Sequence, residues 1–253
     1  MRLLSTVDQE KHKTAAQSLD YDSPQLYWIF RNKDYHHWLN SNCSQVLWLL
    51  GPLECRIRNA ASHIVDLWKS DLGERISVLY FFCSSAAREQ YFAIDFIRAI
   101  ILQIVHDSPS RKDAVITVFL RTLFDAILNA ELVSNPKQSH FQPHDSPDTI
   151  IKKTFDASSN DYWDALTAVL HIVHSQRLFI LIDGLHKIEH QKDKFLKEFR
   201  EFIEHVQEDG SSTIKVLLTS RPQDELKAIL DGMPYIEYDK ERRGSVAIYL
   251  SAD

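Results

Sequence analysis

The chain has 253 residues, of which 44% are hydrophobic and 25% charged, enough for one large α/β domain with a hydrophobic core. The formal net charge is -6 and the pI about 6.0, which argues against a nucleic-acid-binding protein because such proteins present a basic face. No apolar run approaches the roughly 18 residues that cross a bilayer, and residues 1–8 turn polar too soon for a secretory signal. We therefore expect no nucleic-acid partner and no membrane segment.

The cysteines, histidines and glycines argue against disulfides, a metal site and a glycine-rich phosphate loop, respectively. Cys43, Cys55 and Cys83 form no CxxC pair, and an odd number of cysteines suggests reduced thiols in a cytoplasmic protein. The twelve histidines have no cysteine at zinc-finger spacing, so we expect no metal site from them. Only six glycines occur, against about 18 at an average usage of roughly 7%, which leaves few for a loop that cradles phosphate.

In chain order, residues 1–24 predict a polar arm that is either a short helix or a loose segment, ending at the turn residues Asp22-Ser23-Pro24. Aromatic residues between positions 27 and 39 predict a pair of helices packed on the main domain. Beyond them, apolar runs that predict buried strands alternate with amphipathic segments that predict helices. The strands are expected at 46–51, 76–83, 178–183, 214–220 and 235–238, and the helices at 58–68, 88–105, 113–130, 161–175, 195–206 and 223–231.

Strands alternating with helices predict an α/β fold with a doubly wound, mainly parallel five-stranded sheet flanked by helices. Residues 134–149 contain three prolines and no periodicity, so we expect an exposed, mobile loop there.

The most informative strand is the apolar run from Leu178 to Ile182, because it ends in a single carboxylate, Asp183. An acid at the carboxyl end of a buried parallel strand lies where open α/β sheets bind ligands. In P-loop NTPases such an acid holds Mg²⁺ against the nucleotide phosphates. The alternative is that Asp183 caps the following turn or pairs with Arg221, whose backbone is extended because Pro222 follows it.

Three strands together carry a family resemblance: Leu79-Tyr-Phe-Phe-Cys83, Phe179-Ile-Leu-Ile-Asp183-Gly-Leu and Val216-Leu-Leu-Thr-Ser-Arg-Pro222. Over residues 25–222 the chain resembles the fungal NACHT/STAND-type P-loop NTPases, specifically the nephrocystin-3-like N-terminal domain. The resemblance implies a P-loop NTPase-like sheet in which the strand before Gly51 lies beside that of Thr219, which in turn lies beside that of Asp183.

The resemblance also implies ATP or GTP binding with Mg²⁺, oligomerisation, and signalling in fungal non-self recognition and cell death. Family members carry further domains after the NTPase. We therefore expect an N-terminal arm over 1–24, a degenerate NACHT-like α/β domain over 25–240, and a C-terminal tail over 241–253, truncated before those further domains.

The phosphate loop of the family, G-x-x-G-x-G-K-[ST], is aligned with residues 51–58 and is not preserved. Glu54 and Arg56 stand at glycine positions, Ile57 at the lysine, and Arg58 at the Ser/Thr that holds Mg²⁺. The lysine alone supplies charge-assisted bonds to phosphate worth roughly 1.5–3 kcal/mol each. We also expect Glu54 to place a carboxylate where the phosphates would lie.

The acidic pair that follows the strand-end acid in the family is also replaced, by His186 and Lys187. A lysine cannot act as a base at neutral pH unless it is strongly desolvated. We therefore interpret the chain as a pseudo-NTPase with no catalytic residue and no expected cofactor. It would act as a protein-interaction or regulatory module whose partners include full-length NACHT-type relatives.

The vestigial nucleotide site comprises the glycine that ends the first strand, the altered loop, and the two strand-end polar residues: Gly51, Arg56, Ile57, Arg58, Asp183 and Arg221. Other interpretations stay open. Arg56 and Arg58 at a helix N-terminus would bind phosphate in an ATP- or GTP-binding switch, with Mg²⁺ on Asp183. In the opposite interpretation both arginines are solvated or paired with Glu54 or Asp66. A decaying gene product and a site for a non-nucleotide ligand are the remaining alternatives.

Overall fold

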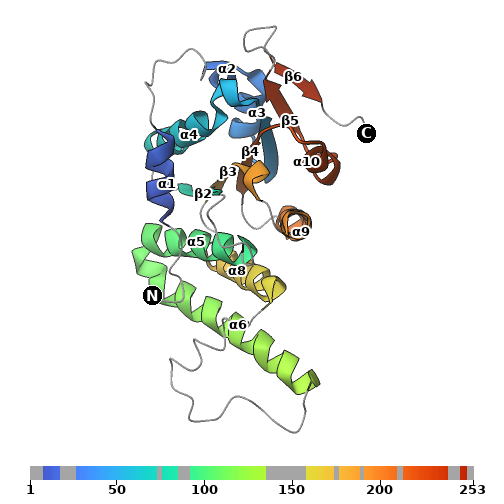
Figure 1. Cartoon of the computed structure of the whole chain (residues 1–253). Helices are drawn as coiled ribbons and strands as arrows, with labels where there is room; N and C mark the ends of the chain where they lie inside the picture. The colour runs from blue at the N-terminus through green and yellow to red at the C-terminus, as the bar shows by residue number, and fades with distance from the viewer. Residues whose placement is uncertain are drawn as a thin grey trace. The chain divides into compact units, whose positions relative to one another are not determined.

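The structure is a computed structural model of the whole chain (Figure 1). It describes residues 8–17, 27–72, 76–84, 92–134, 158–173, 177–188, 191–209, 213–238 and 246–249. The chain divides into two compact units, one built on Ala93–His174 and the other on Val7–Phe92 with Ser175–Asp253. Both predicted domain boundaries, near residues 24 and 240, lie outside the described residues, as does the predicted loop after residue 134.

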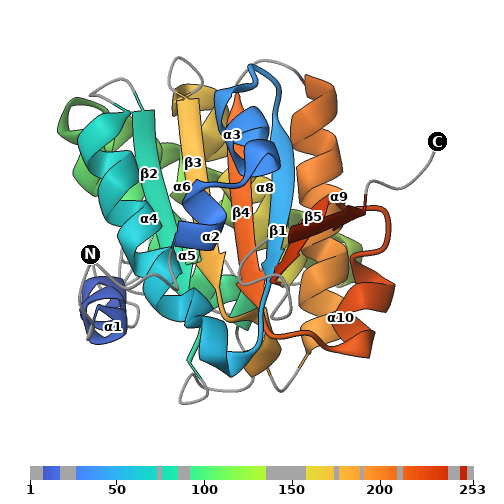
Figure 2. The same cartoon turned by 90° about the horizontal axis from the view of Figure 1, so that it is seen from above.

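The second unit is built on a six-stranded sheet with the order β2-β3-β4-β1-β5-β6 (Figure 2). The strands are β1 (Gln45–Leu50), β2 (Ile76–Phe82), β3 (Arg177–Asp183), β4 (Ile214–Ser220), β5 (Tyr235–Tyr238) and β6 (Val246–Tyr249). Strands β1 to β5 pair in parallel, and β6 pairs antiparallel with β5. The predicted α/β fold with a mainly parallel, P-loop NTPase-like sheet is confirmed, and so is the predicted order of β1, β4 and β3. Strand β6 was not predicted.

The parallel strands are buried on both faces because side chains alternate across the sheet. One face packs on α2 (Tyr27–Phe30), α3 (Lys33–Asn40) and α4 (Ile57–Asp71), as Figure 2 shows. The core on that face includes Trp28, Trp38, Trp68 and Phe179. The predicted aromatic helix pair therefore packs on the sheet, and each fully buried ring of this kind stabilises the fold by roughly 1.5–3 kcal/mol.

The opposite face packs on α9 (Lys192–Asp209), after which α10 (Asp224–Ile229) precedes β5. Phe195 and Phe199 of α9 are fully buried, and the Phe195 ring lies 4.8 Å from that of Phe92, which in turn contacts Phe81 of β2. Layers on both faces hold the ends of β1, β3 and β4 at one edge of the sheet, which is where the candidate site lies.

Helix α1 (Gln9–Ala16) covers the outer strand β2, the edge that would otherwise present unpaired backbone groups. The backbone N–H of Phe82 donates to Gln9 Oε1 at 2.7 Å. Lys13 pairs with Asp66 of α4 at 2.7 Å, and Asn59 of α4 donates to the Ala16 carbonyl. Of the two alternatives for the polar arm, the short helix is thus present and bound to the sheet unit.

The other unit contains α5 (Phe92–Asp107), α6 (Lys112–Ser134) and α8 (Ser159–Val173) (Figure 1). Its interior is aromatic: the Phe96 ring lies 5.7 Å from Trp163 and the Phe119 ring 6.0 Å from Tyr162. Arg98 Nη2 donates to the Tyr162 hydroxyl at 2.7 Å. Within the described residues of the whole chain, none of the helices has the length and apolar character needed to cross a bilayer.

Strand β4 carries a buried lysine without a carboxylate partner among the described residues. Lys215 is 0% exposed, and its ammonium donates to Ser41 Oγ and to Gln45 Oε1. It lies 5.7 Å from the centroid of the Trp38 ring. Burial, assisted by repulsion from Arg177, lowers the pKa of Lys215 to about 8.

This lowered pKa gives a pH-dependent prediction. Below about pH 8 the folded state must hold a buried charge that the unfolded chain carries in water, so Lys215 destabilises the fold there, and that cost fades as the pH rises towards 10.5. We expect Lys215→Met to raise the free energy of unfolding by about 1–3 kcal/mol at pH 7 and to lose that advantage by pH 10. Urea denaturation at several pH values measures it, with the exposed Lys197→Met as control. A pH-independent difference would contradict the prediction.

Candidate functional site

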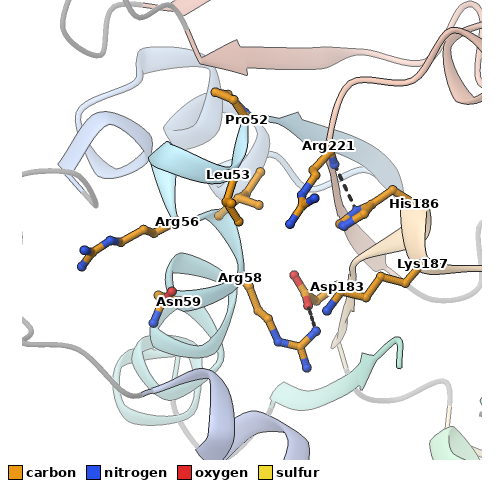
Figure 3. Close-up of a pocket in the computed structure, with 10 residues that line it drawn as sticks. Pro52, Leu53, Arg56, Arg58, Asn59, Asp183, His186, Lys187 and Arg221 are labelled. Carbon is orange, nitrogen blue, oxygen red and sulfur yellow. Dashed lines mark hydrogen bonds and ion pairs between the residues drawn. The ribbon is translucent and has the colours of Figure 1, made fainter. Parts of the chain in front are cut away.

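A cavity of about 350 Å³ opens at the carboxyl ends of β1, β3 and β4. Its volume lies at the lower end of the range for small-molecule sites, and its place is the one where open α/β sheets bind ligands. Its lining consists of Pro52, Leu53, Arg56, Ile57, Arg58, Asn59, Asp183, His186, Lys187 and Arg221 (Figure 3). The structure therefore brings five of the six predicted site residues into one lining, all except Gly51.

Gly51 instead ends β1 beneath the loop. Its N–H donates to the Ser220 carbonyl at 3.1 Å, which joins the ends of β1 and β4. A Cβ atom at this position would lie 2.2 Å from Cys55 Sγ, closer than any real contact. Glycine is therefore needed for the close approach of the loop, whatever the loop binds.

The loop after Gly51 is folded on itself. A short 3₁₀ turn, η2 (Leu53–Cys55), brings the Cys55 N–H to the Pro52 carbonyl at 3.2 Å and the Arg56 N–H to the Leu53 carbonyl at 3.1 Å. Backbone N–H groups that bind phosphate must point at the ligand. Here two of them are used within the loop, so the loop is a closed turn at these residues.

Arg56 has a left-handed backbone, with φ 50° and ψ 41°, at the second replaced glycine position of the loop. A side chain in this conformation costs about 1 kcal/mol, which glycine avoids. The conformation is kept because the Arg56 carbonyl accepts the first helical bonds of α4, from Asn59 N at 2.9 Å and Ala60 N at 3.1 Å. In Figure 3 the Arg56 side chain extends away from the other basic groups.

Ile57, at the position of the phosphate-binding lysine, is only 6% exposed and belongs to the hydrophobic core. An apolar side chain supplies no charge-assisted bond, so this position now stabilises the packing of α4 on the sheet.

Arg58 and Asp183 form an ion pair across the cleft. Arg58 Nη1 lies 3.0 Å from Asp183 Oδ2 and also donates to the Cys83 carbonyl at 3.2 Å (Figure 3). The other carboxylate oxygen, Oδ1, accepts from Thr219 Oγ1 at 2.7 Å. Asp183 is 1% exposed. Burial raises the pKa of its carboxyl, and the Arg58 guanidinium followed by the Thr219 hydroxyl opposes that rise.

Two predicted pairings were therefore wrong. Asp183 pairs with Arg58 and not with Arg221, because α4 begins at Ile57 and places Arg58 in its first turn beside the end of β3. Asp66 is likewise unavailable to Arg58, since it accepts from Lys13. Glu54 is exposed and outside the cavity lining, so the expected carboxylate in the place of the phosphates is absent from the cleft.

The segment after Asp183 turns sharply at Gly184, which has φ 84°, into the 3₁₀ turn η4 (Leu185–Lys187). His186 Nδ1 accepts the Arg221 N–H at 3.1 Å. Burial, then repulsion from Arg221, lowers the pKa of His186 to about 4, so the ring is neutral at pH 7. Lys187 points into the cavity (Figure 3), and burial together with repulsion from Arg58 lowers its pKa.

The cleft is consequently basic. Four of its lining residues are basic (Arg56, Arg58, Lys187 and Arg221) and one is acidic, Asp183. Mg²⁺ prefers several oxygen ligands, and the single carboxylate is already engaged by Arg58 and Thr219, so the donor set does not fit Mg²⁺. In the described part of the chain, no three His, Cys, Asp or Glu residues gather as metal ligands would.

Sequence reasoning named most of this site but missed the contribution of Lys187 and the identity of the partner of Asp183. The sequence did contain a signal for both. In the resemblance, Arg58 stands at the position of the hydroxyl that holds the metal, and Lys187 stands at the position of the catalytic acid.

A parallel sheet of this order, with a loop and helix after β1 and an acid at the end of β3, defines a P-loop NTPase-like α/β protein. The family model described as nephrocystin 3, N-terminal, matches residues 25–221, and the chain belongs to that family. A comparison with curated proteins gave no match.

The ion pair predicts a large effect of single substitutions. Arg58→Met would leave a buried carboxylate without its cation, and we expect a loss of about 3 kcal/mol in the free energy of unfolding. Asp183→Asn in the Arg58→Met background should restore more than 1 kcal/mol, because the amide removes the charge and keeps an acceptor for Thr219. Chemical denaturation of all four proteins gives the cycle, with Lys197→Met as the surface-pair control. A loss in Arg58→Met no larger than in that control would refute the assignment.

The left-handed backbone at Arg56 predicts a difference between two small residues. Arg56→Gly should be more stable than Arg56→Ala by about 1 kcal/mol, because alanine keeps the Cβ that glycine removes while both delete the same charge. Thermal and urea unfolding of the two variants measure it. Equal stability would show that the loop has no left-handed residue here.

Proposed function

We propose that the chain is a pseudo-NTPase of the NACHT/STAND class. The observation that carries the proposal is the Arg58–Asp183 ion pair: the carboxylate that would hold Mg²⁺ is neutralised by a residue of the chain itself. The arginine also takes the place of the hydroxyl that would complete the metal site. Arg58 thus replaces the hydroxyl ligand of the metal and also pairs with the carboxylate ligand, Asp183.

Three further features support the absence of hydrolysis. The lysine position holds buried Ile57, the loop N–H groups of Cys55 and Arg56 bond within the loop, and the position of the catalytic acid holds Lys187. A positively charged group cannot polarise an attacking water as a carboxylate does. Together with the Arg58–Asp183 pair, these features bear on three steps: metal binding, phosphate binding and activation of water.

Without catalysis, the role that we propose is that of a cytoplasmic protein-interaction or regulatory module. Its partners would include full-length NACHT-type relatives, in fungal non-self recognition or cell-death signalling. Membership of the nephrocystin 3 N-terminal family supports this role.

One observation favours a second candidate, an ATP- or GTP-binding switch with a non-standard loop. The cleft is open, about 350 Å³ in volume and basic, although its usual gripping groups are gone. In that case nucleotide binding would require a set of contacts different from those of a P-loop.

Calorimetry and phosphate release separate the two candidates. We expect no micromolar binding of Mg-ATP or Mg-GTP by the wild-type protein, and phosphate release no faster than that of Asp183→Asn. The reason is that the charged and hydroxyl groups that grip a Mg-triphosphate have been replaced. Micromolar binding of either complex, or turnover that Asp183→Asn abolishes, would establish the switch and end the pseudo-NTPase proposal.

A further inference from the structure

The cleft contains more positive charge than its own acid can balance. Asp183 is satisfied by Arg58 and Thr219, and this leaves Lys187 and Arg221. Across the described residues, neither of these two side chains forms an ion pair or a side-chain hydrogen bond within the protein. Figure 3 shows both pointing into the cavity, Lys187 from the turn after β3 and Arg221 from the end of β4.

These cations lie close enough to repel one another. Burial is the main cause of the lowered pKa of Lys187; repulsion from Arg58 and Arg221 adds to it, and the Asp183 carboxylate opposes it. Burial also lowers the pKa of His186, with further repulsion from Arg221, Lys187 and Arg58. Lys187 is half-buried and Arg221 is exposed. Like charges gathered in one cleft disfavour its empty state, and an anion placed among them reduces that repulsion.

The donors suit phosphate in particular. Arg221 offers a planar fork that binds two oxygens of a phosphoryl group, and Lys187 offers a point charge. Neutral His186, whose Nδ1 accepts from Arg221 N, carries its proton on Nε2. Lys187 and Arg221 reach in from different strands, and the one acidic lining residue, Asp183, is paired with Arg58 and also attracts Lys187. A ligand with at least two phosphoryl groups therefore matches better than a single phosphate.

We propose that the cleft binds a compact polyphosphate-class anion, of the pyrophosphate type, directly on Lys187 and Arg221 and without a divalent metal. This inference rests on the proposed function, since it requires that Arg58 keeps Asp183 from holding Mg²⁺. The proposal predicts that Mg²⁺ weakens binding of the anion, whereas Mg²⁺ strengthens nucleotide binding in P-loop NTPases. Mg²⁺ lowers the charge of the ligand and finds no free carboxylate in the cleft, so it weakens binding here.

The test is calorimetric titration of the full chain with pyrophosphate in EDTA, at low and high NaCl. We expect a dissociation constant below 1 mM that rises with salt, since the contacts are ionic. Lys187→Met and Arg221→Met should each weaken binding at least tenfold, and excess Mg²⁺ should weaken it similarly. Lys197→Met, an exposed lysine of α9 that is outside the lining, should bind as the wild type does. Circular dichroism melts confirm that each variant is folded.

Titration with metal-free ATP distinguishes the two possible ligands that carry linked phosphoryl groups, a nucleotide and an inorganic polyphosphate. Binding within tenfold of pyrophosphate supports the proposal with the phosphates as the recognised part. Tighter binding also supports it and assigns the apolar wall of Leu53 and Ile57 to the nucleoside. ATP that binds more than tenfold weaker supports an inorganic polyphosphate ligand.

Three results would overturn the proposal: no binding of pyrophosphate, binding that neither Lys187→Met nor Arg221→Met changes, or binding that Mg²⁺ strengthens. The first two would leave the pseudo-NTPase function in place, because it requires no ligand. Tight Mg-ATP binding with turnover would remove both proposals together.

Discussion

The Arg58–Asp183 ion pair is the interaction on which the chemistry of this cleft depends. It joins the first turn of α4 to the end of β3, and it gives a carboxylate that is 1% exposed the cation that its burial requires. In a P-loop NTPase that positive charge comes from Mg²⁺ and arrives with the nucleotide. Here it is part of the chain, so the buried carboxylate has a cation without a bound ligand.

The backbone around this pair keeps two features of a glycine-rich loop, although only the first glycine of that loop, Gly51, is present. Gly51 is retained because Cys55 Sγ leaves no space for a Cβ, and Arg56 is left-handed although it is not glycine. Strand β1, the turn and α4 thus keep the strand–turn–helix order of such loops, while Ile57 and Arg58 occupy the positions of the lysine and the hydroxyl. The fold depends on the packing of many residues, whereas ligand binding depends on a few side chains, so those side chains can change while the fold is kept.

Most of the fold could be predicted from the sequence because buried parallel strands are continuous runs of apolar residues. Strands β4 and β5 were predicted at their observed bounds, and the Gly51 loop, Asp183 and Arg221 were predicted at neighbouring strand ends. Strand β6 (Val246–Tyr249) was missed because its short apolar run was assigned to the C-terminal tail, outside the α/β domain, and periodicity over four residues does not show which strand it pairs with. The partner of Asp183 was missed because it depends on where α4 begins: a start one residue later would turn Arg58 by about 100° around the helix.

The charge of the cleft shows that hydrolysis and anion binding place different requirements on its residues. Hydrolysis requires a metal in defined geometry and a base for water, and each of these depends on single side chains. Attraction of a phosphate requires only uncompensated cations in a partly desolvated space, and two substitutions that removed catalytic groups, Arg58 and Lys187, each introduced a positive charge. Since Arg58 is balanced by Asp183, the surplus is carried by Lys187 and Arg221. Under the proposed function, the replacements that would prevent hydrolysis therefore also supply positive charge that an anion can bind.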